Sequence, residues 1–274
     1  MKSMKLYDNV RRIHNELAAL GISYDAALRV DQLTPFDQYH YFGTDAVDAA
    51  LEALDLQPGS RVLDIGSGIG GPARYIAAKT GAHVTALELQ PDLNEVARDL
   101  TARCGLSSRV EHVCGDILDG AAAQNYDAII SFLCFLHIPD RRKLLAACRA
   151  ALKPFGAMYI EDYGKPRAFS AAEAEALLVK VQCPFVPKPG EYEAHLRDAM
   201  TVTKGYESKR ADFMAQVRRE HRAIVTAVLA GDPKAARAAA IEHHLNGERR
   251  LIVSGVIKPS RVKRVAKDSQ TRRR

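Results

Sequence analysis

The sequence predicts an α/β fold in which a doubly wound, mainly parallel sheet carries a helical N-terminal cap and a helical C-terminal extension. Three features predict it. Five short apolar runs alternate with helical patterns between residues 61 and 162, a glycine-rich turn directly follows the first run, and the alternation stops after residue 163. Connections long enough to hold a helix force neighbouring strands to pair in parallel through right-handed crossovers.

The N-terminal part has the pattern of a helical cap. Its apolar residues recur at helical spacing, at Val10, Ile13, Leu17 and Leu20. A polar stretch then leads to Thr34-Pro35, where the proline disfavours helix in the residue before it. Over residues 44–54 the pattern becomes helical again, and Thr44 is the predicted N-cap.

The central alternation predicts strands and helices in turn. Strands are expected at residues 61–66, 83–89, 109–116, 126–133 and 157–162, and helices between them at 72–80, 92–104 and 141–152. In such a sheet the ligand crevice lies at the carboxyl ends of the strands, where the order of winding reverses.

Helical patterns return in the C-terminal part. Ser170 is a good N-cap for an alanine- and glutamate-rich helix, a proline-rich loop follows at 183–190, and residues 209–250 predict a helical hairpin broken at 231–233. The expected domains are a helical cap or lid at 1–43, a ligand-binding sheet domain at 44–165, a helical lid or oligomerisation segment at 166–257, and a basic flexible tail at 258–274.

Composition and charge limit the classes of function. Hydrophobic residues make up 47% of the 274 residues and charged residues 26%, as in ordinary globular proteins. The formal charge of +6 comes from residues 258–274, which hold eight Lys or Arg and one Asp. Such a tail is typically a solvated end, so we do not expect nucleic acid as a partner.

Neither a signal peptide nor a membrane span is predicted, because no apolar run reaches the roughly 18 residues that cross a bilayer. We therefore expect a cytoplasmic protein. The five cysteines are widely spaced and form no CxxC pair, so we expect neither a disulfide framework nor a metal site.

The glycine-rich turn GSGIGG at residues 66–71 has the features of a nucleoside-binding site. Gly66, Gly68 and Gly70 admit backbone conformations that are closed to other residues and let a ligand approach the main chain. The following helix points its unpaired N–H groups at the same place. On spacing alone, a dinucleotide fingerprint fits this turn equally well.

Three acidic residues at successive strand ends separate the two kinds of cofactor. Asp64 lies two residues before the first glycine, where a carboxylate suits a cationic group and repels a pyrophosphate. Glu88 ends the second strand, in position to accept hydrogen bonds from ribose hydroxyls, and Asp116 after the third suits the amine of adenine. Together they indicate a phosphate-free, amine-bearing cofactor. Taken singly, each is also explained as a helix N-cap or a strand-end charge.

The motifs VLDIGSGIGGPARYIA, ALELQ, CGD and FLHIPDR, followed by LKPFGAMYIEDY, resemble class I S-adenosylmethionine-dependent methyltransferases, which have a Rossmann-like sheet. They are similar to the group that contains phosphoethanolamine, glycine/sarcosine, tocopherol and sterol methyltransferases. The resemblance implies S-adenosylmethionine as cofactor, bound by the domain at 44–165, and S-adenosylhomocysteine as product. It places the methionine part at Asp64, Gly66, Ser67, Gly68 and Gly70, the ribose at Glu88, Leu89 and Gln90, the adenine at Asp116 and Ile117, and Ser131 behind the fourth strand.

His137, which follows the fourth strand, is the predicted catalytic residue. In the similar phosphoethanolamine enzymes a histidine in the matching motif pairs with an N-terminal tyrosine, and Tyr39 or Tyr41 is the counterpart here. A histidine that titrates near neutral pH can orient or deprotonate an acceptor. The alternatives are a packed or helix-capping role for His137 and lid packing for the two tyrosines.

The chain departs from the family pattern in two places. Leu133 stands four positions before His137, where the phosphoethanolamine enzymes have an acidic residue, and this apolar wall favours an apolar or aromatic acceptor over a cationic amine. Residues 219–245 weakly resemble the last helices of a GntR-superfamily ligand-sensing domain. We interpret this hairpin as a lid or homodimer contact, with solvated histidines at His221, His243 and His244.

The sequence thus predicts an enzyme that transfers a methyl group from S-adenosylmethionine to a small-molecule acceptor at N, O or C. The alternative is a catalytically degenerate S-adenosylmethionine-binding module with a regulatory or interaction role. An RNA methyltransferase rests on the basic tail alone, because the chain has neither an NPPY motif nor a catalytic cysteine pair. A nicotinamide-dependent oxidoreductase would need a turn that tolerates phosphate.

Overall fold

In the computed structural model, the chain separates into two compact units, Met1–Gly205 and Tyr206–Arg274. The structure describes residues 10–120, 125–164, 169–184, 186–188 and 190–199, and in the second unit only residues 234, 235 and 238. The rest of the C-terminal hairpin predicted from the sequence, its three histidines and the basic tail lie outside the described residues. The predicted domain boundaries stay a prediction.

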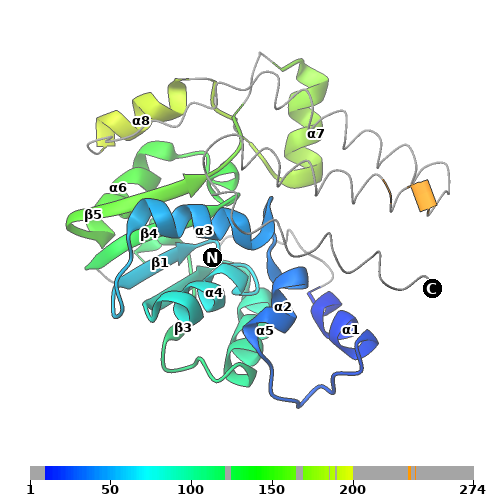
Figure 1. The fold of residues 1–274 in the computed structure, drawn as a ribbon. Helices are drawn as coiled ribbons and strands as arrows, with labels where there is room; N and C mark the ends of the chain where they lie inside the picture. The colour runs from blue at the N-terminus through cyan, green and yellow to red at the C-terminus, as the bar shows by residue number, and fades with distance from the viewer. Residues whose placement is uncertain are drawn as a thin grey trace, which may run out of the picture. The chain divides into compact units, whose positions relative to one another are not determined.

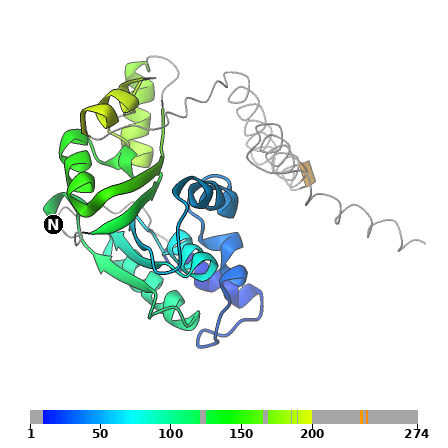
Figure 2. The ribbon, with the colours of Figure 1, turned by 60° about the vertical axis from the view of Figure 1, so that its left-hand side comes forward.

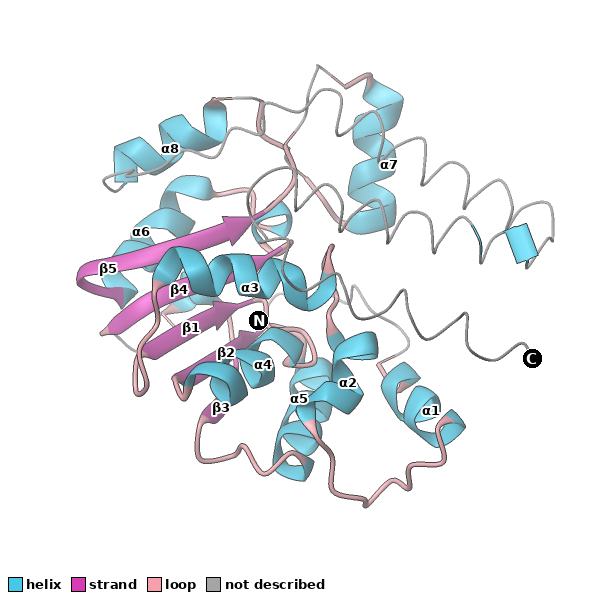
Figure 3. Ribbon diagram, viewed as in Figure 1, coloured by secondary structure: helices cyan, strands magenta, loops and turns pink. Residues whose placement is uncertain are grey.

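A five-stranded parallel sheet forms the centre of the first unit (Figures 1 and 3). Its order is β3-β2-β1-β4-β5, and its members are β1 (Arg61–Ile65), β2 (His83–Glu88), β3 (Val110–Cys114), β4 (Tyr126–Phe132) and β5 (Leu152–Glu161). The order of winding reverses between β1 and β4, which puts the crevice at the carboxyl ends of these two strands. The predicted doubly wound parallel sheet is therefore confirmed.

Helices cover both faces of this sheet. In Figure 2 it stands between the green helix α6 (Arg141–Ala151) and the blue helix α3 (Gly43–Leu54). One apolar cluster joins alternate strand residues such as Val62 and Ile130 to α3 and to α4 (Gly71–Thr80). The residues between them, such as Leu63 and Ile129, pack with α6 in a second cluster. Because both faces are covered, the strands read as continuous apolar runs in the sequence.

The N-terminal cap consists of α1 (Arg12–Ala19) and α2 (Val30–Asp37), which lie beside α5 (Pro91–Arg103) in Figure 1. Ile13, Leu17 and Leu33 are buried together with apolar residues of α5. Ile69 of the glycine-rich turn belongs to the same cluster, so the cap packs directly on the predicted cofactor turn.

Two local predictions for this region are wrong. Pro35 lies inside α2. A proline has no N–H, so it cannot donate to the Asp31 carbonyl four residues earlier. The Thr34 hydroxyl donates to this carbonyl instead, at 3.2 Å, and so compensates for the missing bond. Thr44 is not the N-cap of α3. The helix begins at Gly43, after Phe42 in the left-handed conformation with φ of 66°.

The last described helices are α7 (Ala171–Val181) and α8 (Glu191–Ala199), and α8 packs on α6. The predicted N-cap of α7 is confirmed: the Ser170 hydroxyl accepts a hydrogen bond from the Glu173 amide, and the Glu173 carboxylate accepts one from the Ser170 amide. Within the described residues, no helix is both long and apolar enough to cross a membrane.

Candidate functional site

Asp64 lies at the carboxyl end of the central strand β1. Its side chain is almost completely buried, with 1% of the residue exposed, and Oδ2 has no hydrogen-bond partner among the described residues. Burial raises the pKa of Asp64 to about 7, and the nearby Glu88 carboxylate adds to the rise. A buried acceptor without a donor is costly, so this carboxylate is arranged for a group that the chain does not supply.

Glu88 ends β2 and is held by two backbone amides. Gly68 donates to Oε2 at 2.9 Å, and Gln90 donates to Oε1 at 2.8 Å. Burial raises the pKa of Glu88, although these N–H groups oppose the rise. Each carboxylate oxygen has two lone pairs, so the oriented group can accept further hydrogen bonds from two neighbouring hydroxyls.

The three glycines of the turn have different neighbours, although Gly66, Gly68 and Gly70 all have positive φ, of 76°, 54° and 79°. A Cβ on Gly66 would meet Cys134 Sγ at 2.4 Å, and one on Gly70 would meet His112 Cε1 at 2.7 Å. On Gly68 the nearest atom would be a Tyr39 ring carbon at 3.8 Å. Gly68 is therefore the position of the turn that has room for an added atom, and the Tyr39 ring borders this open side.

Ser67 adds a second polar group to the turn. The residue is 5% exposed, and its hydroxyl has no hydrogen-bond partner among the described residues. Asp64 and Ser67 thus present two unused polar atoms in the motif where the family resemblance places the methionine part.

The residues predicted around the ribose and adenine follow β2 and β3. Leu89 and Gln90 connect β2 to α5, and Gln90 is the N-cap of that helix. Asp116 accepts a hydrogen bond of 2.8 Å from the Leu118 amide and so caps a short 3₁₀ helix, η1 (Ile117–Asp119). Ile117 is 4% exposed in the α6-side cluster.

Ser131 is completely buried in β4, and its hydroxyl donates to the Ile65 carbonyl at 3.0 Å. It therefore joins the ends of β1 and β4, and its role at the cofactor stays a prediction.

His137 ends a second 3₁₀ helix, η2 (Phe135–His137), just beyond β4. Its Nδ1 lies 3.0 Å from the Gln182 carbonyl oxygen. Because a carbonyl can only accept, Nδ1 carries the hydrogen and Nε2 keeps its lone pair. Burial lowers the pKa of His137, which favours the neutral imidazole at pH 7. In this form Nε2 can accept a proton.

The two predicted tyrosines lie at different places. Tyr39 borders Gly68 at the glycine turn. The Tyr41 hydroxyl lies 3.1 Å from that of Tyr163, just beyond β5, and the two rings stack with centroids 6.4 Å apart. The pairing of either tyrosine with His137 stays a prediction.

Two acidic residues lie at the end of β5, and Glu161 was not among the residues predicted from the sequence. Burial raises the pKa of Glu161 to about 7. Asp162 is buried beside Arg141, whose Nη1 lies 3.4 Å away, and accepts a hydrogen bond from Tyr192 at 3.3 Å. The rule that found Asp64 and Glu88, an acid at the carboxyl end of a strand, would also have found Glu161.

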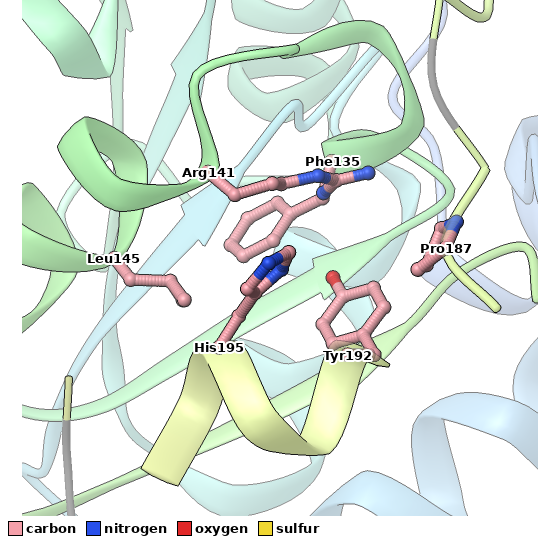
Figure 4. A pocket seen from close by; sticks show the side chains of 6 residues that line it. All are labelled: Phe135, Arg141, Leu145, Pro187, Tyr192 and His195. Atoms are coloured by element: carbon pink, nitrogen blue, oxygen red, sulfur yellow. The ribbon is translucent and has the colours of Figure 1, made fainter. Parts of the chain in front are cut away.

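Figure 4 shows a separate pocket on the α6 side of the sheet, lined by Phe135, Arg141, Leu145, Pro187, Tyr192 and His195. The Arg141 guanidinium lies over the Tyr192 ring, 5.3 Å from its centroid. None of the predicted cofactor residues lines this pocket, so it is distinct from the predicted cofactor site.

The fold and the geometry define an α/β domain with a nucleoside-type site, in which acidic strand ends surround a glycine turn. Residues 62–156 match the family model described as a methyltransferase domain. This part of the chain is therefore a methyltransferase domain, and the family resemblance of the sequence is confirmed for it. The GntR resemblance falls on residues outside those that the structure describes and stays a prediction.

Curated relatives include two kinds of methyltransferase. The glycine/sarcosine/dimethylglycine N-methyltransferase of Actinopolyspora halophila is 32% identical over 144 residues, which cover 52% of this chain and 26% of the relative. The ubiquinone biosynthesis O-methyltransferase of Xanthomonas campestris is 35% identical over 153 residues, covering 52% of this chain and 62% of that protein. In both comparisons the chain spans less than two thirds of the relative's length.

Solved structures share the fold at low identity. A putative sarcosine dimethylglycine methyltransferase from Galdieria sulphuraria aligns with a TM-score of 0.59 at 21% identity, covering 89% of this chain and 94% of that one. The Haemonchus contortus phosphoethanolamine N-methyltransferase 2, in complex with S-adenosyl-L-methionine, aligns with a TM-score of 0.62 at 21% identity, covering 92% and 57%. These structures confirm the Rossmann-like methyltransferase fold.

Proposed function

We propose that this protein is an enzyme that transfers a methyl group from S-adenosylmethionine to a small-molecule acceptor at N, O or C. The observation that carries the proposal is the buried Asp64 carboxylate, whose Oδ2 has no partner among the described residues, at the end of β1. The family of residues 62–156 supports it. Relatives named as N- and as O-methyltransferases both match the chain, so the proposal covers more than one acceptor atom.

The residues of the site fit this cofactor. Asp64 and Ser67 supply unused buried polar atoms, Glu88 supplies an oriented carboxylate, and Gly68 leaves room above the main chain beside the Tyr39 ring. Two neighbouring carboxylates attract a cationic amino acid moiety and repel a pyrophosphate, which argues against a dinucleotide. When bound, S-adenosylmethionine supplies an activated methyl group on a sulfonium.

His137 is the residue that we assign to the acceptor. The Gln182 carbonyl fixes its tautomer, so Nε2 is the atom that orients the acceptor or takes its proton. The lowered pKa of His137 keeps this nitrogen unprotonated at neutral pH. Tyr39 or Tyr41 assists in orienting the acceptor. Positioning supplies most of the rate enhancement, because the donor is already activated.

The remaining segments take supporting roles in this proposal. Residues 1–43 act as a cap or lid over the cofactor domain at 44–165, and the segment at 166–257, which the sequence predicts to be helical, is assigned as a second lid or as the contact of a homodimer. The apolar side chain of Leu133, which packs in a cluster with Leu136, Cys183 and Val186, favours an apolar or aromatic acceptor.

Calorimetric titration tests the cofactor, and a turnover screen tests the enzyme. We expect S-adenosylhomocysteine to bind the purified protein and NADH not to bind. The protein should also be incubated with S-adenosylmethionine and a panel of amines, phosphobases, sterols and phenols. At least one of these acceptors should lead to release of S-adenosylhomocysteine. Cofactor binding without turnover on any acceptor would instead support the degenerate binding module, and absence of binding would overturn the proposal.

A further inference from the structure

Arg74 is a buried arginine in the first turn of α4, directly after the glycine turn. Its side chain is completely buried and pairs with the equally buried Asp37 of α2, with Nη2 at 3.0 Å from Oδ2. The same guanidinium donates through Nη1 to the Ile69 carbonyl at 2.8 Å and to the Thr101 hydroxyl at 3.3 Å. One planar group therefore holds the glycine turn, α5 and the N-terminal cap together.

The glycines next to Arg74 leave room for this contact. A Cβ on Gly71 would lie 2.2 Å from the Asp37 carbonyl oxygen and 2.8 Å from Gln38 Nε2. On Gly70 it would lie 2.9 Å from Arg74 Nη1. The end of α2 thus rests directly on the start of α4, and Gly70 and Gly71 serve this packing, whereas a Cβ on Gly68 would make only a van der Waals contact with Tyr39.

The polar contacts continue from Asp37 into the tyrosine segment, residues 38–41. Gln38 donates to Asp37 Oδ1 at 2.7 Å, and its amide oxygen lies 3.0 Å from His40 Nε2. The His40 ring stacks on Phe132 at the end of β4, with centroids 4.4 Å apart. This chain of contacts fixes both ends of the segment that carries Tyr39 over Gly68 and Tyr41 against Tyr163.

We propose that Arg74 is a positioning residue, which acts through Asp37 to hold the tyrosine segment over the cofactor site. The inference rests on the proposed function, because it assigns the segment to the methyltransferase site. Arg74 itself faces the protein interior: the four described hydrogen bonds of its guanidinium go to Ile69, Ala97, Thr101 and Asp37.

The chemistry of a buried ion pair suggests how to test this separately from stability. Removing one partner leaves an uncompensated buried charge, whereas an apolar pair of similar volume is often neutral for folding. The double variant Asp37→Leu/Arg74→Met therefore retains packing and loses the directional contacts to Gln38 and Ile69. Arg74→Lys is a second variant that keeps the charge but not the planar fork.

Two measurements decide the proposal. Hydrogen–deuterium exchange of residues 38–42 in the ligand-free protein should be faster in the double variant, and the Kd for S-adenosylhomocysteine should rise about tenfold, in the range of a typical coupling between sites. Arg74→Lys should also raise the exchange rate of residues 38–42 and the Kd for S-adenosylhomocysteine, but by a smaller factor. The matched control removes the Lys153–Asp127 ion pair with Asp127→Asn/Lys153→Met and should change neither.

The positioning role would be overturned if the double variant folds and both the exchange of its residues 38–42 and its affinity for S-adenosylhomocysteine equal those of the wild type. If the double variant does not fold, the same two readouts on Arg74→Lys decide the question. If the wild-type protein binds no S-adenosylhomocysteine, the proposed function fails, and the exchange of residues 38–42 still shows whether Arg74 holds the segment.

Discussion

Gly68→Ala tests whether the open side of the glycine turn faces the cofactor. Gly68 has φ of 54°, and the nearest atom to an added Cβ would be 3.8 Å away. The left-handed backbone alone costs an alanine about 1–2 kcal/mol of folding free energy. At roughly 2–4 °C per kcal/mol for a domain of this size, the melting temperature should fall by about 2–8 °C.

The effect of Gly68→Ala on binding should exceed its effect on folding. The methyl group would occupy space that the proposal gives to the cofactor, and overpacking of about 1–3 kcal/mol corresponds to a roughly 5- to 150-fold rise in Kd. Calorimetric titration with S-adenosylhomocysteine measures the change. If Gly68→Ala folds and binds S-adenosylhomocysteine with wild-type affinity, the side of the turn at Gly68 does not face the cofactor.

Two matched glycines separate backbone strain from ligand contact. Gly59 has φ of 83° and no atom within 4 Å of a Cβ, in the turn before β1, so Gly59→Ala should lower stability equally and leave Kd unchanged. Gly66→Ala should lose about 2–5 kcal/mol of stability, because strain adds to a clash with Cys134. Thermal unfolding of the three variants compares these costs.

Three further predictions follow from the site and from α7. Because the folded pKa of Asp64 is raised to about 7, its contribution to the stability of the ligand-free fold is lost as the pH rises from about 4 to about 7, and Glu161 contributes in the same direction. Thermal unfolding across that range should show that Asp64→Asn loses this part of the pH dependence of the melting temperature. Binding of S-adenosylhomocysteine should instead tighten over that range, since its ammonium favours the Asp64 carboxylate, and Asp64→Asn should lose this pH dependence in calorimetry. His137→Gln should lower kcat about 10²- to 10⁴-fold with little change in the Kd for S-adenosylhomocysteine, and an unchanged kcat would leave only a packing role. Ser170→Ala should cost about 1 kcal/mol in denaturant unfolding, because it removes the confirmed cap of α7.

The sheet was predictable because its signals are local. Each strand is a short apolar run, and the carboxyl end of a strand is also the place where Asp64 and Glu88 meet the glycine turn. The strand-end rule works since parallel strands bring their carboxyl ends to one edge. β5 begins at Leu152, five residues before its predicted start, since the earlier residues LKPFG lack a clear apolar run.

The contacts that join distant segments were not predictable from the sequence. Asp37 and Arg74 are 37 residues apart, and Tyr41 and Tyr163 are 122 apart, so no spacing rule relates them. The different neighbours of Gly66 and Gly68 likewise depend on tertiary packing. Pro35 lies in a helix because the neighbouring Thr34 hydroxyl donates to the Asp31 carbonyl, which the proline leaves unpaired. Helix propensities of single residues do not include this compensation.

Titration of the wild-type protein with S-adenosylhomocysteine, with NADH as the comparison, tests whether the site takes a cationic, phosphate-free cofactor. We expect saturable binding of one S-adenosylhomocysteine per chain, weakened in Gly68→Ala and unchanged in Gly59→Ala, and no heat from NADH. Binding of NADH in place of S-adenosylhomocysteine, or no binding of either, would contradict the assignment of the buried Asp64 carboxylate to a cationic, phosphate-free cofactor.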